Sequence, residues 1–574
     1  MVRYLSIGII IVFNFCSILS QDTISTKNLF SPLNIPITFS GNFGEIRSVQ
    51  FHTGVDIRTN MQEGFPVFAV ADGYVSRLKV EMTGYGKAVY IDHPDGTTTV
   101  YGHLRCFNDT LDNYVKTNQY DKNSFAVDLY PAPGQFPIRK GEIIGLSGNM
   151  GISTGPHLHF ESRITKNQEL ENPLIKKLYI KDTLKPVINS VYVYSFDNRN
   201  KLTERKTKYN VKSYQSGKYI LKESDTINIC GTVGLGLDYF DLIFDSVRKF
   251  QLYSTKLIVD STCIFESVFD GFSFEESTNI NSYIDYKQKL QENNNIQLQF
   301  VLPNQNLSIY KNVVNRGLIS FNDNFAHKIE YIIEDASKNI SELVFYMQKS
   351  PSCLISKTYQ EIKCDKYLRW NKKNSFERDG IKVTFPENCL FDDLCFTYKS
   401  SKASYGYLSK IHELSNIYTP LKKPATLSIK PDKFDVVLKE KLLIANVNGK
   451  ECLSSQGGIF KNGYVTTNIS TLGSYAVVVD TTPPEIIPVQ FPESYDFSCI
   501  DTMYIKITDD LSGIANFNGC IDGHWVLFEY KYFNQGIFFV FDNKSLTYGT
   551  IHNLELFVTD KKDNTSVFRM TFYK

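Results

Sequence analysis

Two histidines, His157 and His159, lie one residue apart in a stretch that reads G-N-M-G-I-S-T-G-P-H-L-H-F-E from Gly148 to Glu161. Side chains i and i+2 share one face of a strand, so both imidazoles can reach one small site. One imidazole would then serve as a metal ligand while the other handles protons. The Gly and Pro residues before them predict a turn that brings backbone close to that site. Taken alone, an H-x-H on a strand edge fits two solvated histidines equally well, so the interpretation depends on partners upstream.

A second pair of candidate ligands lies at His52 and Asp56, within F-H-T-G-V-D-I. The glycine and the β-branched residues between them disfavour a helix. On a straight strand the two side chains would share a face but lie roughly 13 Å apart. Both can bind one ion only if the segment bends, and we expect the bend at Gly54. A histidine and a carboxylate are suitable zinc ligands.

His103 follows in Y-G-H-L, at the end of an expected strand, and taken alone would be interpreted as a core or surface histidine. His93 lies in the turn H-P-D-G, where we expect a solvated side chain. The four remaining histidines are scattered and have no nearby ligand pairs, so we expect none of them to bind a functional metal: His327, His412, His524 and His552.

The combined order of these motifs carries more information than any one of them. H-x-x-x-D, then Y-G-H-L, then G-x-S-T-G-P-H-L-H-F-E resembles the lysostaphin/LytM-type zinc metalloendopeptidases over about residues 30–180. The resemblance implies that His52, Asp56 and His159 bind one Zn²⁺ per chain. It also implies that His157 and His103 are the catalytic histidines. Three protein ligands and an open position are typical of a catalytic zinc site, and no HExxH motif is present.

The elements that must position these residues are short strands and tight turns. Fifteen of the 34 glycines fall between residues 41 and 155, among alternating segments such as 74–80, 87–92 and 97–101. The expected fold class is all-β, with a compact antiparallel domain that is LytM-like and related to barrel-sandwich folds. Residues 105–137 interrupt it as a long polar excursion, for which we expect a wall or lid of the substrate groove.

The remaining chain predicts about three immunoglobulin-like β-sandwiches. Two similar linkers, D-T-L-K-P-V-I from Asp182 and D-T-T-P-P-E-I-I from Asp480, precede strand-rich segments. The expected divisions are a signal peptide at 1–20, the LytM-like domain at 21–181, and sandwiches at 187–349, 350–480 and 484–574. Within the first sandwich, the polar segment 272–291 predicts a loop with a short helix.

Composition limits the classes of function. A net charge of +1 gives no electrostatic case for nucleic acid. Residues 1–20 have the charge and short apolar run of an export signal, and no later stretch is apolar enough for a transmembrane helix. We therefore expect an exported protein of the periplasm, envelope or exterior. The eleven cysteines permit disulfides there, but the sequence does not fix their pairing.

The favoured function is an exported zinc endopeptidase that hydrolyses the peptide cross-links of peptidoglycan, a substrate implied by the resemblance. The sandwiches would position the enzyme in the envelope or bind a protein partner. Two alternatives stay open. One is a catalytically idle LytM-like scaffold that regulates another cell-wall hydrolase, although the ligands and catalytic histidines are all present. The other is a secreted protease that acts on foreign walls or proteins.

Overall fold

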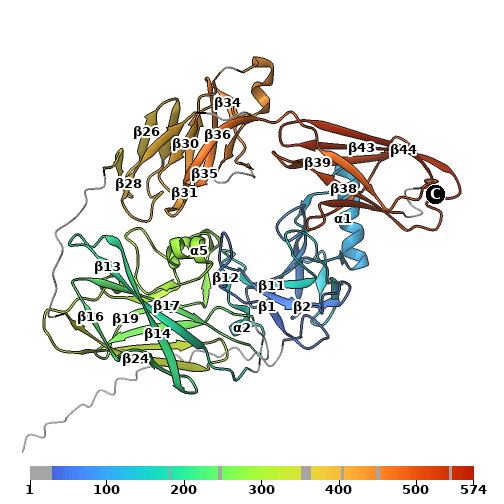
Figure 1. Cartoon of the computed structure of the whole chain (residues 1–574). Helices are drawn as coiled ribbons and strands as arrows, with labels where there is room; N and C mark the ends of the chain where they lie inside the picture. The colour runs from blue at the N-terminus through green and yellow to red at the C-terminus, as the bar shows by residue number, and fades with distance from the viewer. Residues whose placement is uncertain are drawn as a thin grey trace, which may run out of the picture.

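The computed structural model describes residues 29–574, apart from 179, 181, 244–247, 351–362, 403–405, 433, 448–452 and 542–545. The expected signal peptide at 1–20 and the start of the expected 350–480 sandwich lie outside the described residues. The fold is all-β, as predicted, and its strands form four blocks that follow one another along the chain (Figure 1). Within the described residues, no helix is both long and apolar enough to cross a membrane.

The first block, residues 29–180, carries all the candidate site residues. Its elements are β1 (Phe39–Gly41), β2 (Val55–Arg58), β3 (Pro66–Phe68), β4 (Gly73–Val80), β5 (Lys87–Asp92), β6 (Thr97–Gly102), β7 (Cys106–Phe107), α1 (Asp109–Lys122), β8 (Val127–Leu129), β9 (Pro137–Ile138), β10 (Ile143–Leu146), β11 (His157–Ile164), β12 (Leu170–Glu171) and α2 (Pro173–Lys176). The main sheet has the order β1-β2-β11-β6-β5-β4-β8, and β3-β10-β7 form a smaller sheet.

The register of β11 brings the sequence motifs together. His159 on β11 pairs with Asp56 on β2 at one side and with Gly102 on β6 at the other. His103 follows Gly102 directly, so three segments that together span about a hundred residues of sequence meet around one position of the sheet. Beneath them, the alternate apolar residues of these strands are fully buried, among them Ile57, Leu158 and Phe160.

The excursion at 105–137 includes a helix that was not among the predicted elements. It contains α1, whose first turn is capped by the Asn108 side chain, which accepts a hydrogen bond from the Leu111 backbone N–H. Leu111 and Val115 bury one face of α1 in the core of the block. The Asn cap followed by two acidic residues in the first turn, Asp109 and Asp112, is the local signal that predicts this helix.

The second block, residues 187–349, is a large folded sheet with a helical insert. Its elements are β13 (Val187–Phe196), β14 (Leu202–Gln215), β15 (Lys218–Leu221), β16 (Thr226–Ile229), β17 (Val233–Phe240), β18 (Ser254–Val259), β19 (Thr262–Val268), β20 (Gly271–Phe272), α3 (Phe274–Ser277), α4 (Ile280–Tyr283), α5 (Tyr286–Glu292), β21 (Gln297–Leu298), β22 (Tyr310–Val313), η2 (Asn315–Gly317), β23 (His327–Glu334) and β24 (Ile340–Lys349). The insert holds three short helices where one was predicted.

The third and fourth blocks each have two main sheets. In the third, residues 365–480, the elements are β25 (Lys366–Leu368), β26 (Asn374–Arg378), β27 (Ile381–Phe385), β28 (Leu394–Phe396), β29 (Tyr398–Ser401), β30 (Ile411–Leu414), β31 (Pro420–Ile429), η3 (Val436–Lys441), β32 (Leu442–Asn446), β33 (Ser454–Ser455), β34 (Ile459–Lys461), β35 (Tyr464–Thr471) and β36 (Gly473–Val479). A disulfide joins Cys364 to Cys395 beside the β25–β28 pair.

The fourth block, residues 485–574, is a sandwich of two four-stranded sheets, β37-β38-β42-β41 and β40-β39-β43-β44. Its strands are β37 (Glu485–Val489), β38 (Thr502–Thr508), β39 (Ile514–Ile521), β40 (His524–Val526), β41 (Glu529–Lys531), β42 (Gly536–Val540), β43 (Ile551–Asp560) and β44 (Thr565–Tyr573).

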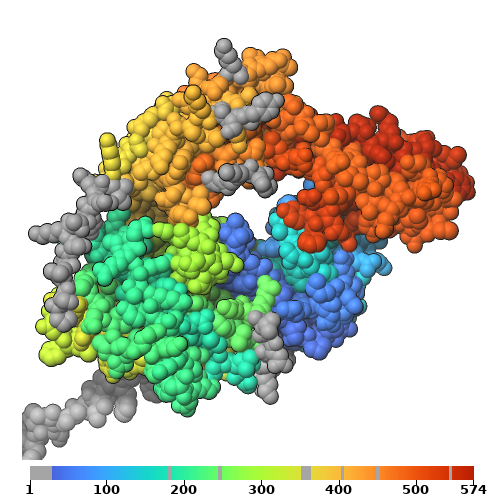
Figure 2. All heavy atoms as spheres, viewed as in Figure 1, coloured from blue at the N-terminus to red at the C-terminus, as the bar shows by residue number. Residues whose placement is uncertain are grey.

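The four blocks close into a ring around a central opening (Figure 2). The fourth block returns to the first, where Lys87 Nζ lies 2.7 Å from a Glu529 carboxylate oxygen. Tyr120 at the end of α1 also packs edge-on against Trp525. The end of α1 thus contacts the fourth block, and the expected role of 105–137 as a wall or lid of the substrate groove stays a prediction.

Candidate metal centre

His52, Asp56 and His159 converge on one point. Asp56 Oδ1 lies 3.1 Å from His52 Nε2 and 2.9 Å from His159 Nδ1, and the two imidazole nitrogens are 3.2 Å apart. All three residues are buried. They are the same three that the sequence motifs marked as ligands, and they form a group able to hold a metal ion.

A bend at Gly54 makes this convergence possible, as the sequence predicted. The chain turns there before β2 begins at Val55, so His52 and Asp56 come into contact although they are four residues apart. A Cβ added at Gly54 would lie 2.4 Å from the Phe160 carbonyl oxygen. The position therefore needs glycine because β11 passes too close for any side chain.

The hydrogen bonds on the far side of each imidazole fix which nitrogen faces the centre. His52 Nδ1 donates to the Asn42 carbonyl oxygen over 2.8 Å, and His159 Nε2 donates to Glu161 over 2.9 Å. The lone pairs of His52 Nε2 and His159 Nδ1 are then directed at Asp56 Oδ1. Three acceptor atoms in mutual contact require a cation among them, either a proton or a metal ion.

The electrostatics of the three residues agree with this requirement. Burial disfavours charge on His159, but its contacts with Asp56 and Glu161 outweigh it and raise its pKa to about 9. Burial lowers the pKa of His52, despite the nearby Asp56, and so favours the neutral ligand form. Burial also opposes ionisation of Asp56, but the adjacent imidazoles, that of His52 above all, hold its pKa well below the usual value.

His157 and His103 lie beside this group and face each other, with ring centroids 4.7 Å apart. His157 Nδ1 donates to the Gly155 carbonyl oxygen over 2.8 Å, which leaves Nε2 as an acceptor 3.4 Å from Asp56 Oδ1. His103 Nδ1 donates to the Met150 carbonyl oxygen over 2.6 Å. His103 also has a left-handed backbone conformation, with φ of 59°, a strained geometry that concentrates at functional sites.

Glu161 ends the G-x-S-T-G-P-H-L-H-F-E motif, and no role for it was predicted from the sequence. Its side chain is fully buried, and besides His159 it accepts hydrogen bonds from Thr53 over 2.6 Å and from Arg163 Nε over 2.7 Å. Burial would raise the pKa of Glu161, but Arg163 and His159 hold it far below its ordinary value. The signal was present, because Glu161 follows His157 and His159 on the same strand face.

The second block supports the centre from outside the first. The Asn42 side chain donates to the Gln251 carbonyl oxygen over 2.7 Å and accepts from the Gln251 N–H over 3.0 Å. Asn42 is the residue whose carbonyl holds His52. Phe51, which precedes His52 in the chain, is buried against Phe269 and Tyr283 of the second block. No sequence pattern pointed to this partnership, since the two sides are more than two hundred residues apart.

The geometry fits zinc. Nitrogen and oxygen ligands at about 2.0–2.1 Å from a tetrahedral ion lie about 3.3 Å apart. The three contacts among His52, Asp56 and His159 are close to this value. Zinc ligands commonly donate their second N–H to a carbonyl or carboxylate, as both histidines do here. Asp56 Oδ2 in turn accepts from Arg47 over 2.6 Å.

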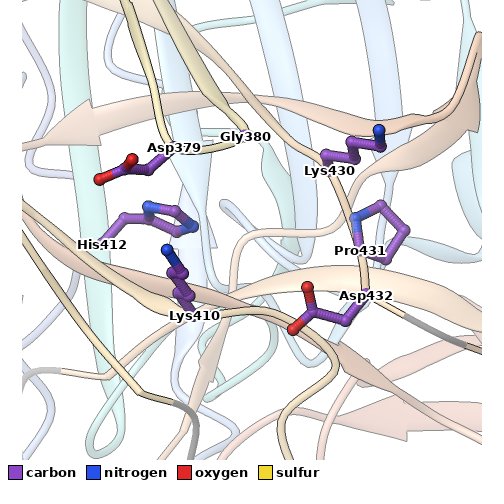
Figure 3. Close-up of a pocket in the computed structure, with 7 residues that line it drawn as sticks. All are labelled: Asp379, Gly380, Lys410, His412, Lys430, Pro431 and Asp432. Atoms are coloured by element: carbon purple, nitrogen blue, oxygen red, sulfur yellow. The ribbon is translucent and has the colours of Figure 1, made fainter.

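Two other histidines, His93 and His412, are buried outside this centre. The expectation of a solvated His93 was wrong: the side chain is buried, bonded to the Asp72 carbonyl oxygen and to Thr99 Oγ1. His412 in the third block lines a hollow of about 510 Å³ with Asp379 and Lys410 (Figure 3). This hollow contains none of the residues of the metal centre.

Comparison with known proteins agrees with the geometry. Residues 50–120 match the model of peptidase family M23. This chain contains a peptidase family M23 domain. Residues 365–480, which form the third block, match the model of the Zu5-like domain.

Three relatives illustrate the extent of the likeness. The DD-carboxypeptidase/endopeptidase Mpg of Neisseria meningitidis is 37% identical over 125 residues, which cover 22% of each chain. An uncharacterized metalloprotease of Haemophilus influenzae is 39% identical over 127 residues, covering 22% of this chain and 21% of that protein. The catalytic domain of the M23 protein EnpA from Enterococcus faecalis is 26% identical, with a TM-score of 0.18, over 24% of this chain and 89% of that one. The match thus spans about a fifth of the length of the curated relatives.

Proposed function

We propose that this protein is an exported, zinc-dependent endopeptidase that hydrolyses peptide cross-links of peptidoglycan. The observation that carries the proposal is the convergence of three acceptor atoms, from His52, Asp56 and His159, with an unligated histidine beside them. The M23 domain and its likeness to a protein named as a DD-carboxypeptidase/endopeptidase support the peptide substrate. The Cys364–Cys395 disulfide supports export, because disulfides persist in oxidising compartments.

The residues of the chain have separable roles in this proposal. Zinc, held by the three ligands, would polarise the scissile carbonyl and acidify a water molecule. His157 would accept the proton of that water at Nε2, because its Nδ1 hydrogen is committed to the Gly155 carbonyl. His103 has the same arrangement towards Met150, so its Nε2 is also an acceptor and would share the proton transfer.

The shell around the ligands would keep their lone pairs aimed at the ion. Glu161 and the Asn42 carbonyl hold the N–H sides of His159 and His52, and Arg47 holds the outer oxygen of Asp56. Such partners commonly change metal affinity or activity by about 10–100-fold when removed. The substrate therefore meets a site whose charge and orientation are set before it binds.

The test is to measure zinc content and digest purified sacculi with the mature protein, identifying the cleaved bond by mass spectrometry. We expect about one zinc per chain and release of monomeric muropeptides from cross-linked material. His157→Ala should keep the zinc and lose turnover, whereas His159→Ala should lose both.

The matched control is His524→Ala, which removes an exposed histidine of the fourth block and should change neither readout. A folded, zinc-loaded wild-type protein that left sacculi intact would contradict the proposed reaction. A folded protein that bound no zinc would contradict the assignment of the centre itself.

A further inference from the structure

Two clusters of three aspartates lie at equivalent places in the second and fourth blocks. Asp182, Asp241 and Asp335 form one, and in each cluster one carboxylate oxygen per residue lies within 4.8 Å of the others. The second cluster consists of Asp480, Asp509 and Asp560. None of these residues belongs to the metal centre described above.

The two clusters are built from the same three structural positions. Asp182 and Asp480 each stand in a D-T linker, five residues before the first strand of the block that follows. Asp241 follows β17 directly, as Asp509 follows β38. The third residue lies at the turn between the last two strands, β23–β24 in one block and β43–β44 in the other.

The hydrogen bonds around the two clusters repeat as well. Asn339 Nδ2 donates to Asp335 Oδ2 over 2.7 Å and to the Asp182 carbonyl oxygen over 3.1 Å. Asn564 Nδ2 makes the corresponding bonds to Asp560 Oδ2 and to the Asp480 carbonyl oxygen, with the same two lengths. A D-x-x-x-N turn thus holds the linker in the same way twice, and the carboxylates face the linker aspartate in both blocks.

The first cluster lacks the partners that its charge requires. Asp241 is 3% exposed, and its Oδ1 has no hydrogen-bond partner among the described residues. Within the same residues, no Lys or Arg forms an ion pair with Asp182, Asp241 or Asp335. A buried carboxylate in such surroundings is costly unless a cation is bound.

The second cluster shares the lack of cationic partners, although N–H groups donate to each of its carboxylates. Asp480 and Asp560 are buried, and no ion pair involves any of its three aspartates within the part of the chain that the structure describes. Lys561 and Lys562 follow Asp560 in the chain. The ammonium of the buried Lys562 donates to the Gly458 carbonyl oxygen. Beside Asp480, the Ser512 N–H donates to the carboxylate while the buried Ser512 Oγ has no described partner.

We propose that each cluster binds one Ca²⁺, which ties the linker to the sandwich that follows it. Calcium takes only oxygen ligands, at 2.3–2.6 Å, so two ligands of one ion can lie up to about 5 Å apart. The spacing within both clusters is inside this limit. The absence of nitrogen or sulfur donors separates these sites from the His-containing zinc centre.

The consequence would be mechanical. The Asp182 cluster lies where the first block joins the second, and the Asp480 cluster lies where the third joins the fourth. Calcium would stiffen two joints of the ring. Extracellular calcium modules bind with dissociation constants of about 10⁻⁴–10⁻³ M, so an exported protein would be loaded outside the cell.

The test is calcium binding to the zinc-loaded mature protein, measured by equilibrium dialysis after removal of calcium, at about 1 mM calcium. We expect about two calcium ions per chain, one per cluster. Asp241→Asn and Asp509→Asn should each remove one, and the double variant should remove both. Asp225→Asn, at an exposed position of the second block, is the control and should keep both.

Thermal unfolding supplies a readout that a purely structural role would not give. Without calcium, Asp241→Asn should unfold at the same or a higher temperature than wild type, because a repelled charge is removed. With calcium, only the wild type should gain stability from the first site. If Asp241→Asn does not fold, Asp182→Asn in the half-buried linker tests the same site. A folded wild-type protein that bound no calcium, or that bound magnesium alone, would overturn the proposal.

Discussion

Replacement of Glu161 by glutamine tests how far the shell around the ligands controls the metal centre. The carboxylate receives donors on both oxygens: His159 and Thr53 bond to Oε1, while Arg163 bonds to Oε2. Glutamine has the same shape but only one acceptor oxygen. Whichever way the amide turns, one set of donors meets an NH₂ group, and the negative charge that balances Arg163 is lost.

Two magnitudes follow from this arrangement. Loss of the carboxylate that orients and polarises His159 should weaken zinc binding by about 10–100-fold, which corresponds to about 1.4–2.7 kcal/mol. Arg163 is buried, and leaving such a charge unpaired costs about 3–5 kcal/mol of folding free energy. The variant should therefore lose both metal affinity and stability, and the loss of stability should persist in the zinc-free protein.

Zinc affinity is measured by competition with a chelator of known affinity, and stability by denaturant unfolding of the zinc-free protein. Glu171→Gln is the matched control, because Glu171 lies on β12 in the same block and contacts Ser162 rather than a ligand. A folded Glu161→Gln protein with wild-type zinc affinity would refute the reasoning that this carboxylate orients His159 as a zinc ligand.

Two further perturbations address the sheet and the ring. Gly54→Ala places a methyl group 2.4 Å from the Phe160 carbonyl oxygen. We therefore expect the free energy of unfolding to fall by about 1–3 kcal/mol and the zinc content to fall as well. If both values stayed unchanged, the close approach of β11 to Gly54 would be contradicted. Glu529→Ala removes the partner of the buried Lys87 ammonium where the fourth block meets the first. We expect a larger radius of gyration in small-angle X-ray scattering with zinc content retained, and an unchanged scattering curve would show that this pair does not hold the ring closed.

The sequence predicted those features of the site that depend on local pattern. Alternation along 157–161 placed His157 and His159 on one strand face, and Gly54 marked the bend that joins His52 to Asp56. The all-β class followed from the spacing of turns and β-branched residues. β11 confirms the prediction that His157 and His159 lie on a strand. The pairing of β11 with β2 and β6 explains why the three motifs meet.

Features that depend on distant partners were not predictable in this way. Asn42 and Gln251 support His52 across 209 positions of sequence, and neither belongs to a motif. His93 was expected in solvent because its local signal is a turn, yet Thr99 on the returning strand bonds to it. Residues 105–137 were expected to form a wall or lid of the groove because the segment is long and polar. Their contacts with the fourth block, through Tyr120 and Phe125, could not be predicted from that pattern.

The closure of the ring has a consequence for the order in which the protein matures. The Lys87–Glu529 contact joins residues 442 positions apart, so it can form only when nearly the whole chain has been made. N-terminal domains generally fold first during synthesis. The first block would then fold before the fourth block is made, and Phe125 and the end of α1 would be exposed to solvent during that time. Chains interrupted before that block would expose an apolar docking face, and aggregation rather than simple loss of one module is their expected fate.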